Sequence, residues 1–554
     1  MEKRVILAIV ICAGIFILWQ QIFPPPKPAA TPPAPAASTA PATTTPAAAP
    51  TAPAAAPVAP AAAGTAAATP VVNHPEQEVE LMTPAVRYVL SSAGGTLKHA
   101  QLREDKYLTV KGDPSSGFDV VRTATAQTAS MRLAFPGSSF NAPSDGSWEV
   151  SRPSSDTVVF TAETDAVRIE KRYHAESAKY RLQLDVTIEN KTAKPANEHL
   201  AIQVFAHQDP NGKGGGFFGG SSANTASVLC YVGDKVERTT VDKLAKETVE
   251  KVGNVRWIGA DEKFFLVAAV PFPESPPKDR TCTQRGLPGE IGQGDLTFSE
   301  RELPAAGKTS YSFALFVGPK VTDDLEQVRP GGEETNLDKS VDVTLSMLSR
   351  PILGLLKIFQ KYVHNWGLAI ILLTLFIKLI TFYPTQRSLL SAKKMQKLGP
   401  KMAAIRKKYE NDRQRQSVET MNLYKAHGVS PFGGCLPSLI QMPIWIALYS
   451  TLNYAVELHR SPFILHIHDL TAKDPYYITP LLMGGVMFLQ MKMSPTSPDN
   501  QQQAMMSVMM PIMFTAFSLV LPSGLALYML TSYLIGILQQ LYVNRVDRKA
   551  GGVA

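Results

Sequence analysis

Cysteine is scarce in this sequence, with four among 554 residues. Cys12 and Cys435 lie in apolar segments, and only Cys230 and Cys282 fall in a polar region that could form a soluble domain. The framework of several disulfides that holds small secreted domains together is therefore excluded. For Cys230 and Cys282 two alternatives stay open, one disulfide or two unpaired buried thiols, because spacing alone does not decide between them.

The motifs of ATP hydrolysis and of intramembrane proteolysis are also absent. The sequence contains no Walker A motif, HExxH or GxSG, and the run from Gly212 to Gly216 lacks the spacing and the following Ser or Thr of a phosphate loop. The segment His466-Ile467-His468-Asp469 has no further ligand nearby in the sequence, which argues against a metal site. We therefore expect a protein that is not an enzyme, with no catalytic residue, cofactor or metal.

Positive charge is concentrated in one segment. Residues 385–430 contain eleven Lys and Arg against three acidic residues, an excess that equals the formal net charge of +8 of the whole chain. The rest of the chain therefore sums to zero, and the high isoelectric point is no sign of a DNA-binding protein.

The first 72 residues predict a membrane anchor and a spacer. After Lys3 and Arg4 the chain is apolar from Val5 to Ile22, close to the length of about 20 residues that spans a bilayer. An uncleaved anchor with its N-terminus inside fits better than a cleaved signal, whose apolar region is shorter. Pro24 to Val72 is almost entirely Pro, Ala and Thr, a composition that cannot bury a core.

An all-β domain is predicted after the spacer. Segments such as 167–173 and 180–188 alternate apolar and polar residues and are separated by Gly, Pro, Asn and Asp. About 250 residues of this pattern predict a large β sandwich.

The second half of the chain is apolar and predicts five further spans. They are Trp366–Tyr383, Phe432–Val456, Tyr476–Gln490, Ser507–Leu521 and Leu525–Val543. With six spans both termini lie in the cytoplasm, and the basic segment 385–430 lies there too, as the positive-inside rule requires. Before the second span, residues 338–363 place apolar side chains at helical spacing, which predicts an amphipathic helix on the outer membrane interface.

Lys378 is the only charged residue in the second span. Its ammonium group either reaches the cytoplasmic interface on its flexible stem or lies in a hydrated cavity that attracts acidic clients, and both interpretations stay open. Gly433-Gly434, Pro437 and Pro443 interrupt the third span around Gln441, an amide that needs a partner, which favours the cavity.

Two more features indicate binding surfaces. Ten of the 18 methionines lie between Met483 and Met529, and flexible thioethers suit surfaces that accept varied apolar partners, although filling gaps between helices is an alternative for each of them. The basic segment predicts two helical stretches, Ser388–Leu398 and Lys401–Ala426, broken at Gly399-Pro400 and again near Asn411-Asp412. Its charge sets the orientation in the membrane, and its length favours docking to lipid, RNA or a targeting factor as well.

The chain resembles the YidC membrane-protein insertases of Gram-negative bacteria over about 338–543. The motifs that carry the resemblance are Asn365-Trp366-Gly367, Thr374 to Lys378, Pro431-Phe432-Gly433-Gly434-Cys435-Leu436-Pro437, Leu439 to Ile444, Asp474-Pro475-Tyr476-Tyr477, Lys492-Met493-Ser494-Pro495 and Pro522-Ser523-Gly524-Leu525. The resemblance implies a polytopic α-helical membrane protein of the bacterial inner membrane. Its six spans would include a five-helix insertase core, and its periplasmic domain would be an all-β super-sandwich similar to galactose mutarotase.

The resemblance also implies a groove that captures apolar segments of clients and releases them sideways into the membrane. The residues implied to line the groove are Lys378, where relatives usually carry Arg, Thr374, Gln441 and Tyr528. Those of an apolar slide are Met442, Ile446, Met509, Met513 and Phe517. Those of a docking hairpin are Lys393, Lys394, Lys401, Arg406, Lys407 and Lys408.

The partners expected from the resemblance are nascent membrane proteins, phospholipid, the Sec translocon, the ribosome and the signal recognition particle pathway. Two other classes of protein remain, a transporter that binds an anion at Lys378 and a tethered envelope scaffold that acts through its β domain. The predicted boundaries are 1–23 for the anchor, 24–72 for the linker, 73–330 for the β domain, 331–364 for the interfacial helix, 365–384 for the second span, 385–430 for the cytoplasmic hairpin, 431–543 for spans three to six and 544–554 for a short tail.

Overall fold

The computed structural model describes residues 75–110, 112–122, 125–141, 146–209, 225–274, 279–341, 346–428, 436–493 and 501–549. The chain divides into two units, Met1–Thr69 and Pro70–Ala554, and all of the described residues belong to the second. The predicted anchor and linker, the glycine-rich turn at 212–216, and Cys12 and Cys435 lie outside the described residues.

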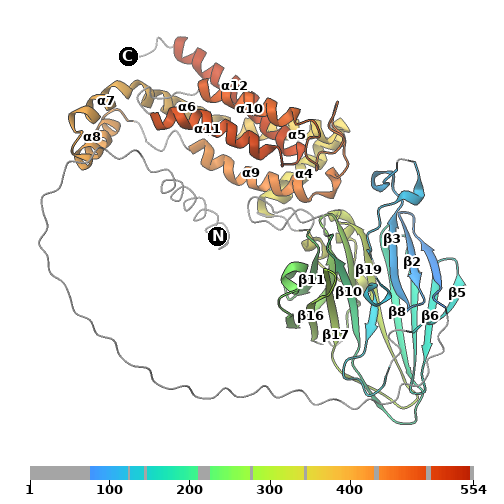
Figure 1. Ribbon diagram of the computed structural model, residues 1–554. Coiled ribbons are helices and arrows are strands. Elements are labelled where there is room, and N and C mark those ends of the chain that lie inside the picture. The colour runs from blue at the N-terminus through green and yellow to red at the C-terminus, as the bar shows by residue number, and fades with distance from the viewer. Residues whose placement is uncertain are drawn as a thin grey trace, which may run out of the picture. The chain divides into compact units, whose positions relative to one another are not determined.

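The predicted all-β domain is present between residues 78 and 319 (Figure 1). Its two large sheets are antiparallel. The nine-stranded sheet has the order β12 (Lys235–Thr240), β11 (Ser227–Val232), β14 (Val255–Asp261), β15 (Phe265–Pro271), β19 (Lys308–Pro319), β8 (Arg181–Asn190), β7 (Val167–Ala175), β6 (Thr157–Glu163) and β5 (Glu149–Ser154). The five-stranded sheet has the order β13 (Val249–Gly253), β16 (Arg280–Leu287), β17 (Ile291–Phe298), β10 (Ala201–His207) and β4 (Arg132–Ala134). Smaller sheets are formed by β1 (Glu78–Met82), β2 (Val86–Ser91) and β3 (Thr96–Leu102), and by β18 (Arg301–Leu303) and β9 (Ala196–Glu198).

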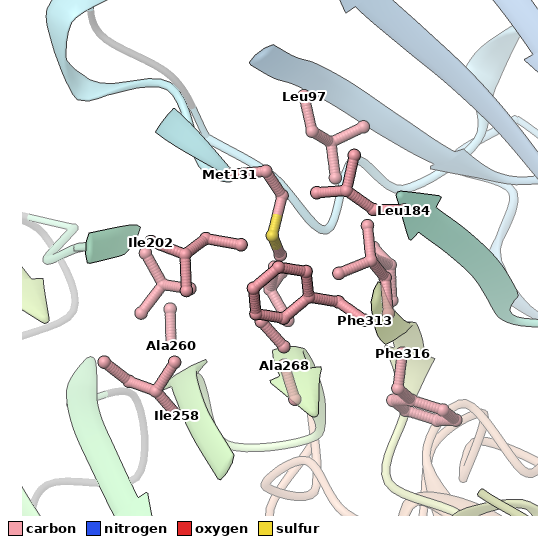
Figure 2. Packing of buried hydrophobic residues seen from close by; sticks show 14 of the residues in the cluster. Leu97, Met131, Leu184, Ile202, Ile258, Ala260, Ala268, Phe313 and Phe316 are labelled. Atoms are coloured by element: carbon pink, nitrogen blue, oxygen red, sulfur yellow. The ribbon is translucent and has the colours of Figure 1, made fainter. Parts of the chain in front are cut away.

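The alternating pattern that predicted strands also decides what they bury. In β8 every second residue is buried, so one face of the strand contributes to the core. Leu184 of β8 pairs with Phe313 of β19, and both point into the same core as Ile202 of β10 and Ile258 of β14 (Figure 2). The core therefore contains side chains from both large sheets, as expected for a sandwich.

A disulfide joins the two large sheets. Cys230 of β11 and Cys282 of β16 are bonded, with their Cα atoms 6.5 Å apart, and both are buried. Of the two alternatives that the spacing left open, the structure has the disulfide.

The C-terminal region is helical (Figure 1). Its helices are α4 (Ser346–Val363), α5 (Trp366–Ile380), α6 (Phe382–Lys397), α7 (Gly399–Lys408), α8 (Arg413–Ala426), α9 (Leu436–Tyr454), α10 (Ile478–Met493), α11 (Gln501–Ser518) and α12 (Ser523–Lys549). Among the described residues, one stretch, Ser523–Val546, is long and apolar enough to cross a membrane as a single helix. The pair α5 and α6, bent by 62°, is a second candidate, whereas α10 and the apolar part of α11 are shorter. The six predicted spans therefore stay a prediction.

One helix boundary differs from the sequence prediction, and another agrees with it. The second span was expected to continue to Tyr383, but α5 ends at Ile380 and the chain bends before α6. Pro384 explains this break, because it has no N–H group to donate to the carbonyl of Ile380 and its ring would clash there.

The basic segment contains three helices, and α8 begins where Asp412 accepts a hydrogen bond of 2.9 Å from the backbone nitrogen of Arg415. The break suspected near Asn411-Asp412 is thereby confirmed.

Candidate functional site

Lys378 lies on α5, which packs against α12. Asn365 caps α5 by accepting a hydrogen bond of 3.1 Å from the backbone nitrogen of Leu368. Lys378 is half-buried among the apolar residues of this helix. Within the described part of the chain it forms no hydrogen bond and no ion pair, so an anionic partner from outside the chain would meet a free ammonium group.

Thr374 lies four residues before Lys378 and therefore on the same face of α5. Its side chain is completely buried, and its hydroxyl donates a hydrogen bond of 2.7 Å to the carbonyl of Ile370. The hydroxyl group therefore donates its hydrogen bond within the helix itself. Thr374 therefore lies in the interior of the helical region and not on an exposed surface.

Gln441 and Tyr528 are brought together by the fold. The side-chain amide of Gln441 on α9 donates a hydrogen bond to the hydroxyl of Tyr528 on α12, which is buried. This bond supplies one of the hydrogen-bond partners that the Gln441 amide needs in the predicted apolar span. It also joins two helices that contact each other. Among the described residues neither Lys378 nor Thr374 hydrogen-bonds to this pair.

The predicted slide residues divide into two groups. Met509 and Met513 are exposed on α11, beside the exposed Val508 and Ile512. Met442 and Ile446 on α9 are half-buried, as is Phe517, which packs against the core of the helical region. α11 therefore presents a continuous apolar surface, whereas α9 presents a partly covered one.

The predicted docking residues lie on α6 and α7. Lys394, Lys401, Arg406, Lys407 and Lys408 are exposed, and Lys393 is half-buried and donates a hydrogen bond of 3.4 Å to the carbonyl of Val543. α7 and α8 pack together through Tyr424, whose hydroxyl contacts the sulfur of Met402 at 3.3 Å. The helices thus form a small packed unit that leaves five of the six cations in solvent.

Several motifs to which the sequence assigned no role connect the loop between α9 and α10 to the ends of other helices. A Cβ atom at Gly367, in the first turn of α5, would overlap the ring of Phe463. The backbone nitrogens of Ser523 and Gly524, at the start of α12, donate to the carbonyls of Ala472 and Leu470 at 2.7 and 2.9 Å. In the sequence, the sign of these contacts was a glycine inside an apolar motif. Such a glycine indicates that another segment of the chain approaches closely.

Asp474 organises the end of the same loop. Its carboxylate accepts hydrogen bonds from the backbone nitrogens of Tyr476 at 3.0 Å and Thr479 at 2.8 Å, and it pairs with His466 at 3.1 Å. Burial opposes the charge, but these hydrogen bonds together hold the pKa of Asp474 below its usual value. His466 is therefore part of a helix cap. Within the described residues no group of three or more His, Cys, Asp or Glu side chains is placed to hold a metal.

This loop also contacts the β domain. Lys106, in the short helix η1 (Asp105–Tyr107), donates hydrogen bonds of 2.9 and 2.8 Å to the carbonyls of Val456 and Glu457. The ring of His459 packs near those of Tyr107 and Phe264, with centroid distances of 6.5 and 4.7 Å. Burial lowers the pKa of His459 to about 4.

Comparison with known proteins gives matches over almost the whole chain. Residues 78–355 match the family model described as the YidC periplasmic domain, and residues 358–550 match that of the 60Kd inner membrane protein. A membrane protein insertase YidC from Syntrophus aciditrophicus is 35% identical, over 98% of this chain and 100% of its own. One from Anaeromyxobacter dehalogenans is also 35% identical, over 99% of this chain and 98% of its own. A crystal structure of an active YidC insertase covers 84% of this chain and 92% of its own at 19% identity, with a TM-score of 0.37.

Proposed function

Because the chain belongs to the YidC family of membrane protein insertases, we propose that it captures apolar segments of nascent membrane proteins in a hydrated cationic groove and releases them laterally into the inner membrane. The observation that carries this proposal is the ammonium group of Lys378, half-buried in an apolar helix and without an ionic partner among the described residues. A charge in that position is costly, and an approaching carboxylate offsets the cost.

The groove residues have different tasks in this proposal. Lys378 attracts acidic or polar residues that precede the client's apolar segment, while the hydrogen bond between Gln441 and Tyr528 holds α9 against α12, the helix on which α5 also packs. The apolar segment then moves along the exposed side chains of Met509 and Met513 into lipid. Partitioning of apolar side chains into the bilayer supplies the driving force, so no nucleotide is needed.

The membrane arrangement that we propose has six spans. α5, α9, α10, α11 and α12 form the core, the anchor at 5–22 is the first span, and both termini lie in the cytoplasm. The short apolar lengths of α5 and α10 are compatible with spanning if neighbouring helices and interfacial residues complete the path. The positive charge of 385–430 supports the orientation.

The exposed cations of α6 and α7 are proposed to receive clients on the cytoplasmic side. Lys394, Lys401, Arg406, Lys407 and Lys408 are directed to solvent, where they suit contact with anionic lipid or ribosomal RNA. We propose that the protein acts alone or together with the Sec translocon, and that the ribosome and the signal recognition particle pathway deliver clients to it.

Insertion by the purified full-length protein in liposomes tests the role of Lys378. The client is a small single-span protein with an acidic segment before its apolar stretch, and the readout is the protease-protected fraction. Unit charges about 8 Å apart at an effective dielectric of about 20 interact by about 2 kcal/mol. Reversing the sign with Lys378→Glu should therefore lower the initial rate of insertion by about tenfold or more. Lys378→Arg should retain most of it.

Lys361→Glu is the matched control. Lys361 is exposed on α4 and undergoes the same change of charge without altering the groove, so insertion should be unchanged. Equal rates for Lys378→Glu and wild type would contradict the cationic groove, and no insertion above that of empty liposomes by wild type would contradict autonomous insertase activity.

A further inference from the structure

The turn 463–467 in the loop between α9 and α10 exposes large apolar side chains. Leu465 is 87% exposed and Ile464 is 55% exposed. Among the large apolar side chains of the described residues only Met347 is as exposed as Leu465. The two adjacent side chains form one exposed apolar patch at the tip of the turn. Contact of this patch with water would be unfavourable.

The backbone of this turn is strained at Leu465, whose φ of +54° lies in the left-handed region. Two backbone hydrogen bonds hold the turn, from the nitrogen of Phe463 to the carbonyl of Ile467 at 2.9 Å and from that of Ile467 to the carbonyl of Ile464 at 3.2 Å. Glycine or asparagine would adopt this conformation at lower cost. A leucine is therefore disfavoured at this position by its backbone conformation, and its apolar side chain is exposed. Packing within the described part of the chain does not explain why a leucine stands here.

The contacts of Phe463 set the depth of the turn. Its ring lies against Gly367 in the first turn of α5, and its carbonyl accepts a hydrogen bond of 3.3 Å from the side chain of Asn365, the residue that caps α5. α5 is apolar from Trp366 onward. The turn is therefore level with the end of a helix whose apolar side chains require lipid or protein around them.

The same loop identifies the side of the membrane. Lys106, in the segment that matches the YidC periplasmic domain, donates hydrogen bonds to the carbonyls of Val456 and Glu457. The loop between α9 and α10 is thus on the periplasmic side. Tyr476, just before α10, is 68% exposed on this loop, and tyrosine is enriched where membrane meets water.

We propose that the turn 463–467 inserts Ile464 and Leu465 into the outer leaflet of the inner membrane, at the boundary between headgroups and acyl chains. The lipid surface is the partner because the turn is level with the end of an apolar helix and its side chains are directed away from the folded chain. The insertion holds the loop between α9 and α10 at a constant depth. The proposal depends on the location in the membrane and not on the groove around Lys378.

Fluorescence quenching in vesicles tests this proposal. The full-length protein carries Leu465→Cys labelled with the dye NBD, in a background of Cys12→Ser and Cys435→Ser that leaves the buried disulfide intact. Vesicles of phosphatidylethanolamine and phosphatidylglycerol contain spin-labelled lipid with the quencher either near the headgroup or near the end of the acyl chain. We expect a blue-shifted emission and stronger loss of fluorescence from the shallow quencher, because an interfacial side chain lies about 5–10 Å into the boundary.

Val252→Cys in the same background is the matched control, since Val252 is 66% exposed on β13 of the β domain. Its label should emit as in water and escape both quenchers. A label at position 465 that behaves like that at 252 would overturn the proposal. A blue shift without quenching would also overturn it, because a protein partner or a second copy of the chain would then cover the turn.

A stability measurement separates a lipid role from a packing role. Leu465→Asn accepts the left-handed backbone and removes the apolar side chain, so the melting temperature in detergent should stay the same or rise. A lower melting temperature would mean that Leu465 holds the turn together, which would contradict the proposal.

Discussion

His459 shows how a single side chain couples the loop between α9 and α10 to the β domain. Its half-buried ring contacts the rings of Tyr107 and Phe264, and the charged groups that act on it are Asp469 and the three cations Arg460, Lys106 and Lys263. Burial outweighs the attraction of Asp469, so the neutral ring is the form that packs. Protonation would add a fourth cation to a site that already holds three.

We expect the stability of this contact to depend on pH. The pKa of His459 is about 4 in the fold, below its ordinary value near 6.5, so the unfolded chain binds more protons between these values. The contribution is complete above about pH 6.5 and is lost as the pH falls toward 4. The melting temperature of the full-length protein in detergent should therefore fall over this range, and less steeply in His459→Phe. His174→Phe, on an exposed side chain of β7, should keep the wild-type slope.

From the sequence, individual residues of the candidate site could be proposed, but not the partners that they have in the fold. Lys378 could be identified because a charge stands out in an apolar span, and Gln441 because an amide there needs a hydrogen bond. That Tyr528 would supply that bond could not be deduced from the residues themselves, since the two lie 87 positions apart. The ring contact of His459 with the β domain was missed for the same reason, because it joins segments from different parts of the chain.

At the scale of elements, α10 and α11 pack together at a position where one of them has no side chain. A Cβ atom at Gly484 of α10 would overlap the hydroxyl oxygen of Thr515 on α11. Thr515 in turn donates a hydrogen bond of 2.6 Å to the carbonyl of Pro511, which holds its side chain in place. The two helices thus approach as closely as small residues allow, a common way of packing helices in membranes.

Gly484→Ala should destabilise this helix pair by about 1–3 kcal/mol, since an added methyl group must displace a fixed side chain. The melting temperature of the full-length protein in detergent is the measurement. Gly485→Ala is the control, because a Cβ atom there meets nothing within 4 Å. In the double variant Gly484→Ala with Thr515→Ala, at least half of the loss should be recovered, and purely additive effects would refute the contact.

Helix ends were less predictable than helices. The apolar segments were recognisable because every one of them contains long runs without charge. Their limits depended on local chemistry, as in the bend between α5 and α6, where Pro384 breaks the hydrogen-bond ladder, and at α10, where Asp474 supplies the cap. Of these two features, only the Asp shortly before an apolar run is a general sign that a helix begins.

At the scale of the whole molecule, the disulfide and the residues of the candidate site lie in different regions of the chain. The disulfide between Cys230 and Cys282 joins strands of the two large sheets and closes a loop with a sequence separation of 52 residues. It constrains the unfolded β domain, whereas Lys378, Gln441 and Tyr528 all lie on helices after residue 365.

Replacing both cysteines by alanine should therefore lower the stability of the β domain by roughly 2–4 kcal/mol and leave insertion in liposomes unchanged. Limited proteolysis of the full-length protein across a urea series would report the first effect. Reduction of the wild type should reproduce it, and Cys12→Ser should not. Loss of insertion in the folded variant would show that the β domain takes part in the insertion step.

The strand order could not be predicted from the sequence, although the strands could. β8 pairs with β19, more than 100 residues later, through partners such as Leu184 and Phe313. Such pairings depend on the closure of the whole sheet rather than on any local pattern. The division of the described residues into an all-β region and a helical region, in contrast, could be predicted, because alternating and continuous apolar patterns are visible in the sequence itself.

The short apolar helices have a consequence for the lipid around them. α5 has 15 residues and α10 has 16, so at about 1.5 Å per residue each is only about 22–24 Å long, against a hydrocarbon core of about 30 Å. In the proposed six-span arrangement the bilayer beside these helices must become thinner, at a cost of a fraction of a kcal/mol per Å of mismatch. In that arrangement a polar client segment would have a shorter hydrocarbon path beside these helices than through bilayer of ordinary thickness.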